Sequence, residues 1–344
     1  MRKEQPRKGE VTVLGAGVVG LTTAAVLRQR GVDVRVVADR VGPDTSSVVA
    51  GAVWFPFKVD VRRRSARWAR DGYRWLRRAS SNPATGVLPA LPFHLLEREE
   101  PQGHARPDWA RAIPPGVRVE WVPLEELAAP ARDRAIRAGC AGAWRFPAPL
   151  VDPPRHMEWL LTRVGRVERV AEPLGSLSDL KGGVVVNCTG RRARALTGDV
   201  ALEPRLGQIV VARDAGLPRS SGFVDATSAS ALVYSIPRGG SVVLGGFDSD
   251  QDDGPAAWTQ PDPPGPDPAI ERRILGRLAE QGLVASDTSS LAEWRPIREV
   301  DGVNAVRLER EGSVIHNYGH GGSGYTLAYG CAREVARILA RSAW

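Results

Sequence analysis

Cysteine and long apolar runs are scarce in this chain of 344 residues. The three cysteines, Cys140, Cys188 and Cys331, are too few and too widely spaced for a disulfide framework or a cysteine-based metal site. No run of about twenty apolar residues is present, and the charged N-terminus lacks the apolar core of a signal peptide. These absences argue against a disulfide-rich secreted domain and against a membrane protein. They predict a soluble protein of the reducing cytoplasm.

Lysine is also rare, with four residues in the whole chain, so the formal net charge of +8 comes almost entirely from arginine. The arginines are spread among acidic residues, with short clusters such as 62–64 and 77–78. A nucleic-acid surface would gather them into one basic stripe with aromatic platforms for stacking. We therefore expect solvated helix faces and no nucleic-acid partner.

The chain does contain enough apolar material for a large core, because 42% of its residues are hydrophobic. Its length suits two domains that share one ligand cleft. Periodicity and turn signals predict helices at 61–79, 153–164 and 268–281, and strands at 88–97, 184–186, 208–212, 232–236, 241–245 and 313–318. The proline-rich stretches 101–130 and 250–268 are expected to be mainly loop.

The clearest functional signal lies in residues 11–40. A short apolar run predicts a buried parallel strand, and it leads into the G-x-G-x-x-G turn of residues 15–20, a helix, and a second strand that ends at Asp39. This order of strand, glycine turn, helix, strand and acid is typical of dinucleotide-binding folds. A glycine-rich turn without a ligand is the alternative, but it does not account for the acid.

Each residue of the motif has a physical task. Gly15 allows the tight turn, Gly17 lets the backbone approach a pyrophosphate, and Gly20 lets the helix pack close to the strand. The pyrophosphate would then lie at the positive helix N-terminus, and the Asp39 carboxylate would accept hydrogen bonds from the ribose hydroxyl groups. The sequence therefore predicts a dinucleotide site.

A second glycine-rich turn lies near the end of the chain. The strand expected at 313–318 runs into GHGGSG at 319–324, and Thr326 is predicted to start the final helix. Small residues also follow the strand at 184–186, in the stretch Asn187-Cys188-Thr189-Gly190. Ligands lie at the carboxyl ends of strands in parallel sheets, so both turns are expected to face the cleft.

Beyond these local signals, an ordered set of segments spans nearly the whole chain: VTVLGAGVVGL, VVADR followed by TSSVVAGAVWFP, VVVNCTG, RLGQIVV, YSIPRGGSVVLGG, WRPIR, VRLERE and VIHNYGHGGSGYT. In this order the segments resemble the D-amino-acid oxidase family of flavoenzymes. The resemblance implies an α/β fold, with a doubly wound Rossmann-type FAD-binding domain interleaved with a substrate domain on a mixed, largely antiparallel sheet. It divides the chain into an FAD-binding domain at 9–59, 151–200 and 296–344 and a substrate-binding domain at 60–150 and 201–295.

The resemblance also implies a non-covalent FAD and positions for its contacts. These are Gly15, Ala16, Gly17, Val18, Val19, Gly20, Asp39, Arg40, Thr45, Ser46, Ser47, Gly51, Ala52, Val53, Val170, Thr189, Gly321, Gly322, Ser323, Gly324, Tyr325 and Thr326. No metal is expected.

For the substrate, the family's carboxylate-binding pair falls on Tyr234 and Arg295, and its amine-facing carbonyl falls on Gly322. The planar fork of arginine suits this task, because it binds a carboxylate through two hydrogen bonds and stays charged when buried. Without the resemblance, a structural ion pair and a packed strand aromatic would be the simpler interpretations of these two side chains.

The family mechanism needs no protein base, since the substrate gives its α-hydride directly to the flavin N5. His316 and His320 straddle a strand end and a glycine turn, and no further metal ligand is in sight. We interpret both as structural, together with His94, His104 and His156.

Two departures from the family pattern affect the substrate. Phe55 replaces an amide near the substrate, and the segment 220–230, where the family has a long lid, is short and contains no tyrosine. A more apolar and more open pocket predicts neutral, apolar D-amino acids, unless Arg219 or Arg238 reaches the pocket.

The resulting prediction is a soluble D-amino-acid oxidase, acting on a D-amino acid and O₂ as a monomer or homodimer. The alternatives are a flavin oxidase of glycine, N-alkyl amino acids or a biosynthetic intermediate, a flavin-binding protein without turnover, and an NAD-dependent dehydrogenase.

Overall fold

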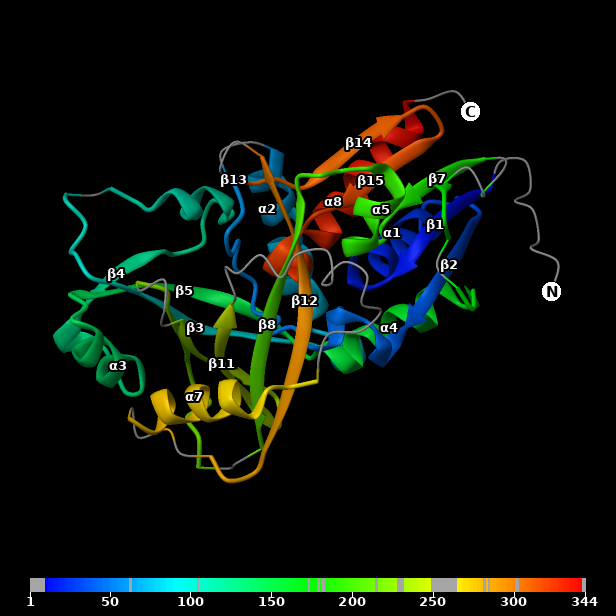
Figure 1. Ribbon diagram of the computed structural model, residues 1–344. Helices are drawn as coiled ribbons and strands as arrows, with labels where there is room; N and C mark the ends of the chain where they lie inside the picture. The colour runs from blue at the N-terminus through cyan, green and yellow to red at the C-terminus, as the bar shows by residue number, and fades with distance from the viewer. Residues whose placement is uncertain are drawn as a thin grey trace.

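The computed structural model of the chain describes residues 10–61, 64–103, 105–172, 174–177, 180, 183–213, 216–227, 232–248, 265–280, 283, 285–300 and 303–341. Within these ranges the strands form two sheets (Figure 1). None of the helices in these ranges has both the length and the apolar composition that a membrane span requires.

The first sheet has the order β14-β15-β7-β1-β2-β6 and is parallel except for β14. Its strands are β1 (Val11–Ala16), β2 (Val34–Val41), β6 (Val167–Arg169), β7 (Val184–Asn187), β14 (Arg307–Glu311) and β15 (Val314–Tyr318). Val11, Val13 and Val186 are fully buried, which suits the central strands of a parallel sheet. The carboxyl ends of β1, β2 and β7 therefore meet at one edge, where such sheets bind ligands.

Five helices accompany this sheet in the described residues: α1 (Val18–Arg28), α2 (Arg64–Ala79), α4 (Pro153–Val164), α5 (Ala193–Thr197) and α8 (Gly324–Ala340). α8 packs between α1 and α2. A side chain at Gly72 of α2 or Gly330 of α8 would overlap the backbone of the other helix. The two helices can therefore approach closely only because these positions lack a Cβ atom.

The second sheet has the order β13-β12-β8-β11-β10-β9-β3-β5-β4 and is antiparallel except where β3 meets β9. Its strands are β3 (Val87–Glu97), β4 (Glu120–Pro123), β5 (Gly142–Val151), β8 (Leu202–Ala212), β9 (Gly222–Asp225), β10 (Val233–Arg238), β11 (Ser241–Asp248), β12 (Thr288–Val300) and β13 (Val303–Asn304). The long strands β8 and β12 run side by side through the centre of the molecule (Figure 1).

Two helices lie beside the second sheet, α3 (Ala131–Ala138) and α7 (Pro268–Ala279). α7 packs on β8 and β11 and buries Ile274 and Leu278 in a core cluster with Val210 and Leu244. Asp267 caps α7, since its side chain accepts a hydrogen bond of 2.7 Å from the backbone N–H of Ala269. An apolar face and a side-chain cap thus fix this helix.

The predicted fold class is confirmed, and so are the helices expected at 153–164 and 268–281 and the strand at 88–97. The final helix begins at Gly324, so the predicted start at Thr326 is wrong by two residues. Several strands were not predicted, among them β5 and β12; both contain proline, which weakens a local strand pattern, although β3 was predicted in spite of its two prolines. Most of the loop expected at 250–268 lies outside the described residues.

Candidate functional site

Two adjoining cavities lie at the carboxyl edge of the first sheet, with volumes of about 430 Å³ and 150 Å³. Val18, Ser46 and Ser47 belong to the walls of both, so the two cavities adjoin along this shared wall. A large cavity at the glycine turn joined to a small one fits an elongated cofactor that ends beside a small substrate.

The glycine turn forms the floor of the larger cavity. Gly15 has a φ of +106°, and a Cβ atom there would lie 2.5 Å from the carbonyl oxygen of Cys188. A Cβ atom at Gly20 would overlap the carbonyl of Gly15, and one at Gly17 would come within 3.1 Å of Ser47 Oγ. Sterics therefore require glycine at positions 15 and 20, whereas at Gly17 the only close neighbour is the Ser47 side chain.

The N-terminus of α1 opens directly above this turn. Gly17 is its N-cap residue and supplies no side chain, and the backbone N–H of Val18 donates to Ser47 Oγ at 2.9 Å. Backbone N–H groups at a helix start favour an anionic ligand, because the helix dipole adds positive charge there. The larger cavity thus has the features that a pyrophosphate requires.

Asp39 lies at the end of β2 in the wall of the larger cavity. Its Oδ2 is 2.9 Å from Nη2 of Arg192, which lies in the same wall. This ion pair orients the carboxylate and leaves its other oxygen as an acceptor. The position agrees with the predicted role of Asp39 at the adenosine ribose.

The smaller cavity has an apolar wall. Phe55 packs edge-on against Trp109, with 5.5 Å between ring centroids, and tilts toward Phe146 at 6.3 Å. Phe93, Val224, Leu232 and Ile236 complete the apolar lining from β3, β9 and β10, together with Phe57 and Ala50. None of the described residues that line this cavity carries a charge.

Tyr234 and Tyr325 also line the smaller cavity. The Tyr325 hydroxyl donates to the backbone oxygen of Ser47 at 2.9 Å and so ties α8 to the wall that the two cavities share. The Tyr234 ring lies against Gly245 and Gly246 of β11, where any side chain would overlap it. Two glycines therefore create the space in which Tyr234 is held.

Most of the residues implied by the family resemblance are brought together. The larger cavity is lined by Gly15, Ala16, Gly17, Val18, Val19, Asp39, Arg40, Thr45, Ser46, Ser47, Val170 and Thr189, and the smaller one by Gly51, Ala52, Val53, Phe55, Tyr234, Gly321, Gly322, Gly324 and Tyr325. Gly322 lies close to Phe57, since a Cβ atom there would be 3.2 Å from its ring.

Three of the implied contacts lie outside both walls: Gly20, Ser323 and Thr326. Ser323 Oγ donates to the backbone oxygen of Phe57 at 3.0 Å, and Thr326 Oγ1 donates to that of Phe55 at 2.8 Å. Both side chains therefore hold the segment that carries the phenylalanines.

The backbone of Arg295 lies in β12, opposite Arg205 of β8, and its side chain is outside the described part of the chain. The predicted carboxylate anchor at this position therefore stays a prediction.

Several lining residues were not predicted. Arg191 and Arg192 directly follow the predicted Thr189, so adjacency in the sequence was the available signal. Phe93 and Val224 gave no such signal, because a strand pattern does not say which residue faces a cavity formed with another strand.

The described histidines are buried, and burial favours their neutral forms. It lowers the pKa of His320 to about 3 and that of His156 to about 4. His156 Nδ1 lies 2.7 Å from the backbone oxygen of Thr85, and His94 Nδ1 lies 3.2 Å from that of Gly222. His104 lies outside the described residues.

Within the described ranges, no three His, Cys, Asp or Glu side chains gather in a group that could hold a metal ion.

Comparison with known proteins agrees with this geometry. Proteins named D-amino-acid oxidase are similar over nearly the full chain: that of Streptomyces coelicolor is 36% identical over 349 residues, covering 97% of this chain and 98% of the relative. That of Rubrobacter xylanophilus is 34% identical over 341 residues, covering 95% and 94%. Among solved structures, glycine oxidase from Geobacillus kaustophilus has a TM-score of 0.71 at 18% identity, covering 98% of this chain and 96% of that one.

The model of one protein family, described as FAD dependent oxidoreductase, matches residues 10–338. This match covers both sheets and both cavities. The description of this family gives FAD as the cofactor. The two cavities have the glycine turn, the helix N-terminus and the acidic residue at the ribose position that a dinucleotide needs. This chain belongs to the FAD dependent oxidoreductase family.

Proposed function

We propose that this chain is a D-amino-acid oxidase that prefers neutral, apolar D-amino acids. The reaction converts a D-amino acid, O₂ and water into a 2-oxo acid, ammonia and H₂O₂. The curated relatives named above support the class of reaction. The observation that carries the substrate preference is that the described residues lining the smaller cavity, which adjoins the dinucleotide cavity, are uncharged and mainly apolar.

FAD would lie through both cavities. Its pyrophosphate would be held at the glycine turn and the start of α1, and its adenosine ribose would be held by Asp39. When bound, FAD supplies the redox chemistry by accepting the α-hydride of the substrate at N5.

The protein would contribute substrate orientation. We assign Tyr234 and Arg295 to the substrate carboxylate and the backbone carbonyl of Gly322 to the amine. No acid, lysine or histidine lies among the described residues that line the smaller cavity. This supports a mechanism in which the free amine is oriented for hydride transfer and no side chain removes a proton from carbon.

The side-chain preference follows from the cost of burying charge. An acidic substrate side chain would lie against Phe55, Phe93 and Ile236, and the described residues that line this cavity include no cation to pair with it. Arg219 and Arg238, which could have supplied a cation to the pocket, do not line this cavity. Arg219 donates a hydrogen bond to the backbone oxygen of Gly239 at 3.3 Å, and Arg238 donates one to the backbone oxygen of Ala50 at 3.2 Å. By contrast, each CH₂ group of an apolar substrate side chain that is buried in this cavity stabilises the bound state by about 0.8 kcal/mol.

The decisive test compares kcat/KM for D-Leu and D-Asp at neutral pH, with peroxide release as the readout. We expect D-Leu to be favoured by at least about tenfold. A preference for D-Asp would mean that a cation reaches the pocket. Higher activity on glycine or sarcosine would favour the related flavin amine oxidases, and a yellow protein without any turnover would favour a flavin-binding protein.

We also propose the division into an FAD-binding domain at 9–59, 151–200 and 296–344 and a substrate-binding domain at 60–150 and 201–295. The first sheet supports it, because all six of its strands lie in the FAD-binding part, whereas β12 of the second sheet crosses the boundary at 295/296 and β13 lies beyond it. A cytoplasmic location and a monomeric or homodimeric state complete the proposal. Light scattering during gel filtration measures the oligomeric state.

A further inference from the structure

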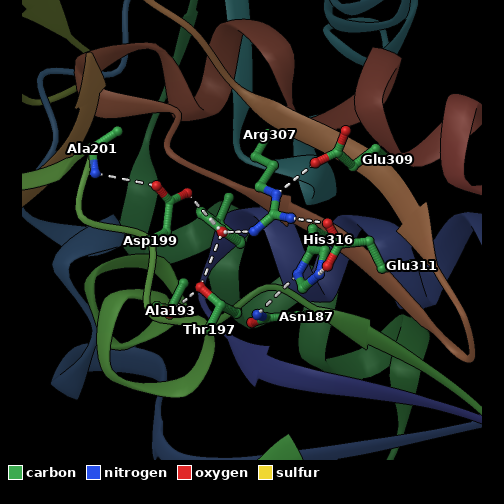
Figure 2. A network of polar contacts seen from close by, with 10 residues as sticks. Asn187, Ala193, Thr197, Asp199, Ala201, Arg307, Glu309, Glu311 and His316 are labelled. Atoms are coloured by element: carbon green, nitrogen blue, oxygen red, sulfur yellow. Dashed lines mark hydrogen bonds and ion pairs between the residues drawn. The ribbon is translucent and has the colours of Figure 1, made fainter. Parts of the chain in front are cut away.

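A chain of polar contacts runs from Thr189 in the wall of the larger cavity through Asn187 and His316 to Glu311 at the end of β14. Figure 2 shows its part from Asn187 to Glu311. Its centre is the neighbouring pair β7 and β15, which run parallel with His316 opposite Asn187. Both side chains are buried, at 0% exposure for Asn187 and 2% for His316. Polar groups at this depth need defined partners, because an unpaired one costs more free energy than a hydrogen bond gains.

On the cavity side, Asn187 holds Thr189. The Asn187 side-chain oxygen accepts from Thr189 Oγ1 at 2.7 Å and from its backbone N–H at 3.2 Å. Thr189 lines the larger cavity beside Gly15, and the carbonyl of Cys188 lies directly under that glycine. The side-chain amide of Asn187 therefore holds the segment 187–190 against the glycine turn of residues 15–20.

On the other side, His316 fixes the amide. His316 Nε2 lies 3.2 Å from Oε2 of Glu311, a carboxylate that can only accept, so Nε2 carries the proton. Nδ1 then has a free lone pair, and it lies 3.5 Å from the amide nitrogen of Asn187. If the amide of Asn187 were reversed, its oxygen would face this lone pair and its NH₂ group would face the donors of Thr189.

We propose that His316 is a positioning residue for the flavin: its neutral Nδ1 orients Asn187, and Asn187 holds Thr189 in the cofactor wall. The inference rests on the proposed contact between Thr189 and FAD. It gives His316 a role beyond packing, although the residue touches neither cavity.

The geometry makes this role depend on protonation. A proton on Nδ1 would place a donor opposite the donor of Asn187. Burial lowers the pKa of His316, the nearby Arg307 acts in the same direction, and Glu311 and Glu309 oppose them. The lowered pKa keeps His316 neutral at pH 7, so flavin affinity is full there and is lost as the pH falls below the ordinary histidine range.

The test measures the FAD dissociation constant by dilution of the holoenzyme, with free-flavin fluorescence as the readout. His316→Leu removes the acceptor and is expected to raise the constant by about tenfold at pH 7.5. His316→Asn keeps an acceptor near the position of Nδ1 and is expected to stay within about threefold of the wild type. It should also remove the weakening of FAD binding that we expect of the wild type as the pH falls below the ordinary histidine range.

Tyr318→Phe is the matched control, because Tyr318 lies on the same strand and bonds to Arg307, Thr197 and Asp199 but not to Asn187. It is expected to lower the thermal midpoint and leave FAD affinity unchanged. Equal affinity in the wild type and His316→Leu overturns the inference, as does equal loss in the Leu and Asn variants.

Thr189→Val separates this inference from the proposed function. If it weakens FAD binding while His316→Leu does not, only the role of His316 fails. If Thr189→Val leaves the affinity unchanged, the assignment of Thr189 to the cofactor fails, and the role of His316 fails with it.

Discussion

The two cavities are built in different ways. The larger one is formed mainly by backbone and short side chains at the ends of β1, β2 and β7, and its central motif is continuous in the sequence. The smaller one is enclosed by large side chains from β3, β9, β10 and the segment 50–57, which are far apart in the chain. In a cavity formed by backbone, adding a single side-chain atom should abolish ligand binding. In a cavity formed by side chains, substitutions should change the substrate preference gradually.

The largest effect is expected at Gly15. Gly15→Ala would force an alanine into a φ of +106° and place its Cβ atom 2.5 Å from the carbonyl oxygen of Cys188. We expect FAD affinity to fall by more than about 100-fold. Gly31→Ala is the matched control, because Gly31 also has a positive φ, of +78°, but a Cβ atom there meets nothing within 4 Å. Equal flavin content in the two variants would contradict this steric role.

The next largest effect is expected at Arg295. Arg295→Ala would remove the two hydrogen bonds to the substrate carboxylate, and we expect kcat/KM for D-Leu to fall by about 100-fold or more. FAD should stay bound, so the protein should remain yellow. Arg295→Lys should recover only part of the loss, because a point charge does not reproduce the planar fork. Near-normal kinetics in the yellow Ala variant would remove Arg295 from the site.

A smaller effect is expected at Asp39, in the side-chain part of the larger cavity. Asp39→Ala should weaken FAD binding by about tenfold, which corresponds to one charge-assisted hydrogen bond. At saturating FAD, kcat/KM should stay unchanged. Asp44→Ala serves as the control, since Asp44 lines the same cavity but forms an exposed ion pair of 2.8 Å with Arg169. An unchanged dissociation constant for Asp39→Ala would show that the ribose contact is wrongly assigned.

The smallest effect is expected at Phe55, in the wall of the smaller cavity. Phe55→Ala should lower kcat/KM for D-Leu by about threefold to tenfold and leave that for D-Ala nearly unchanged, because only the longer side chain loses apolar contact. Phe55→Leu should restore most of the loss. A uniform drop for both substrates would place Phe55 in the support of the cofactor and not in the side-chain pocket.

Local signals in the sequence were sufficient for much of the fold. The helix at 153–164 was predictable from Asp152 and Pro153, which cap and start it, and the structure shows this cap. β5 and β12 were harder to predict, because proline disfavours a strand locally and these two are stabilised by pairing with distant strands, β5 with β3 and β4 and β12 with β8 and β13. The division of the chain into domains stays a prediction.

The candidate site divides in the same way. Gly15, Gly17, Gly20 and Asp39 could be assigned from one continuous motif, because the chemistry of a pyrophosphate and a ribose requires those residue types at that spacing. The ion pair of Asp39 with Arg192 could not be assigned from the sequence, because the two residues are far apart in the chain. They meet because β2 and β7 end at the same edge of the sheet.

The sequence by itself determined the dinucleotide turn, the α/β fold and the membership of a flavoenzyme family, because each depends on local spacing or on segments kept in a fixed order. The tertiary structure decided which apolar residues enclose the smaller cavity and that Arg219 and Arg238 do not line it. It also decided that His316 and Asn187 lie opposite each other. The physical reason is that strand register and long-range packing set these neighbours, and neither is encoded in any single stretch of the chain.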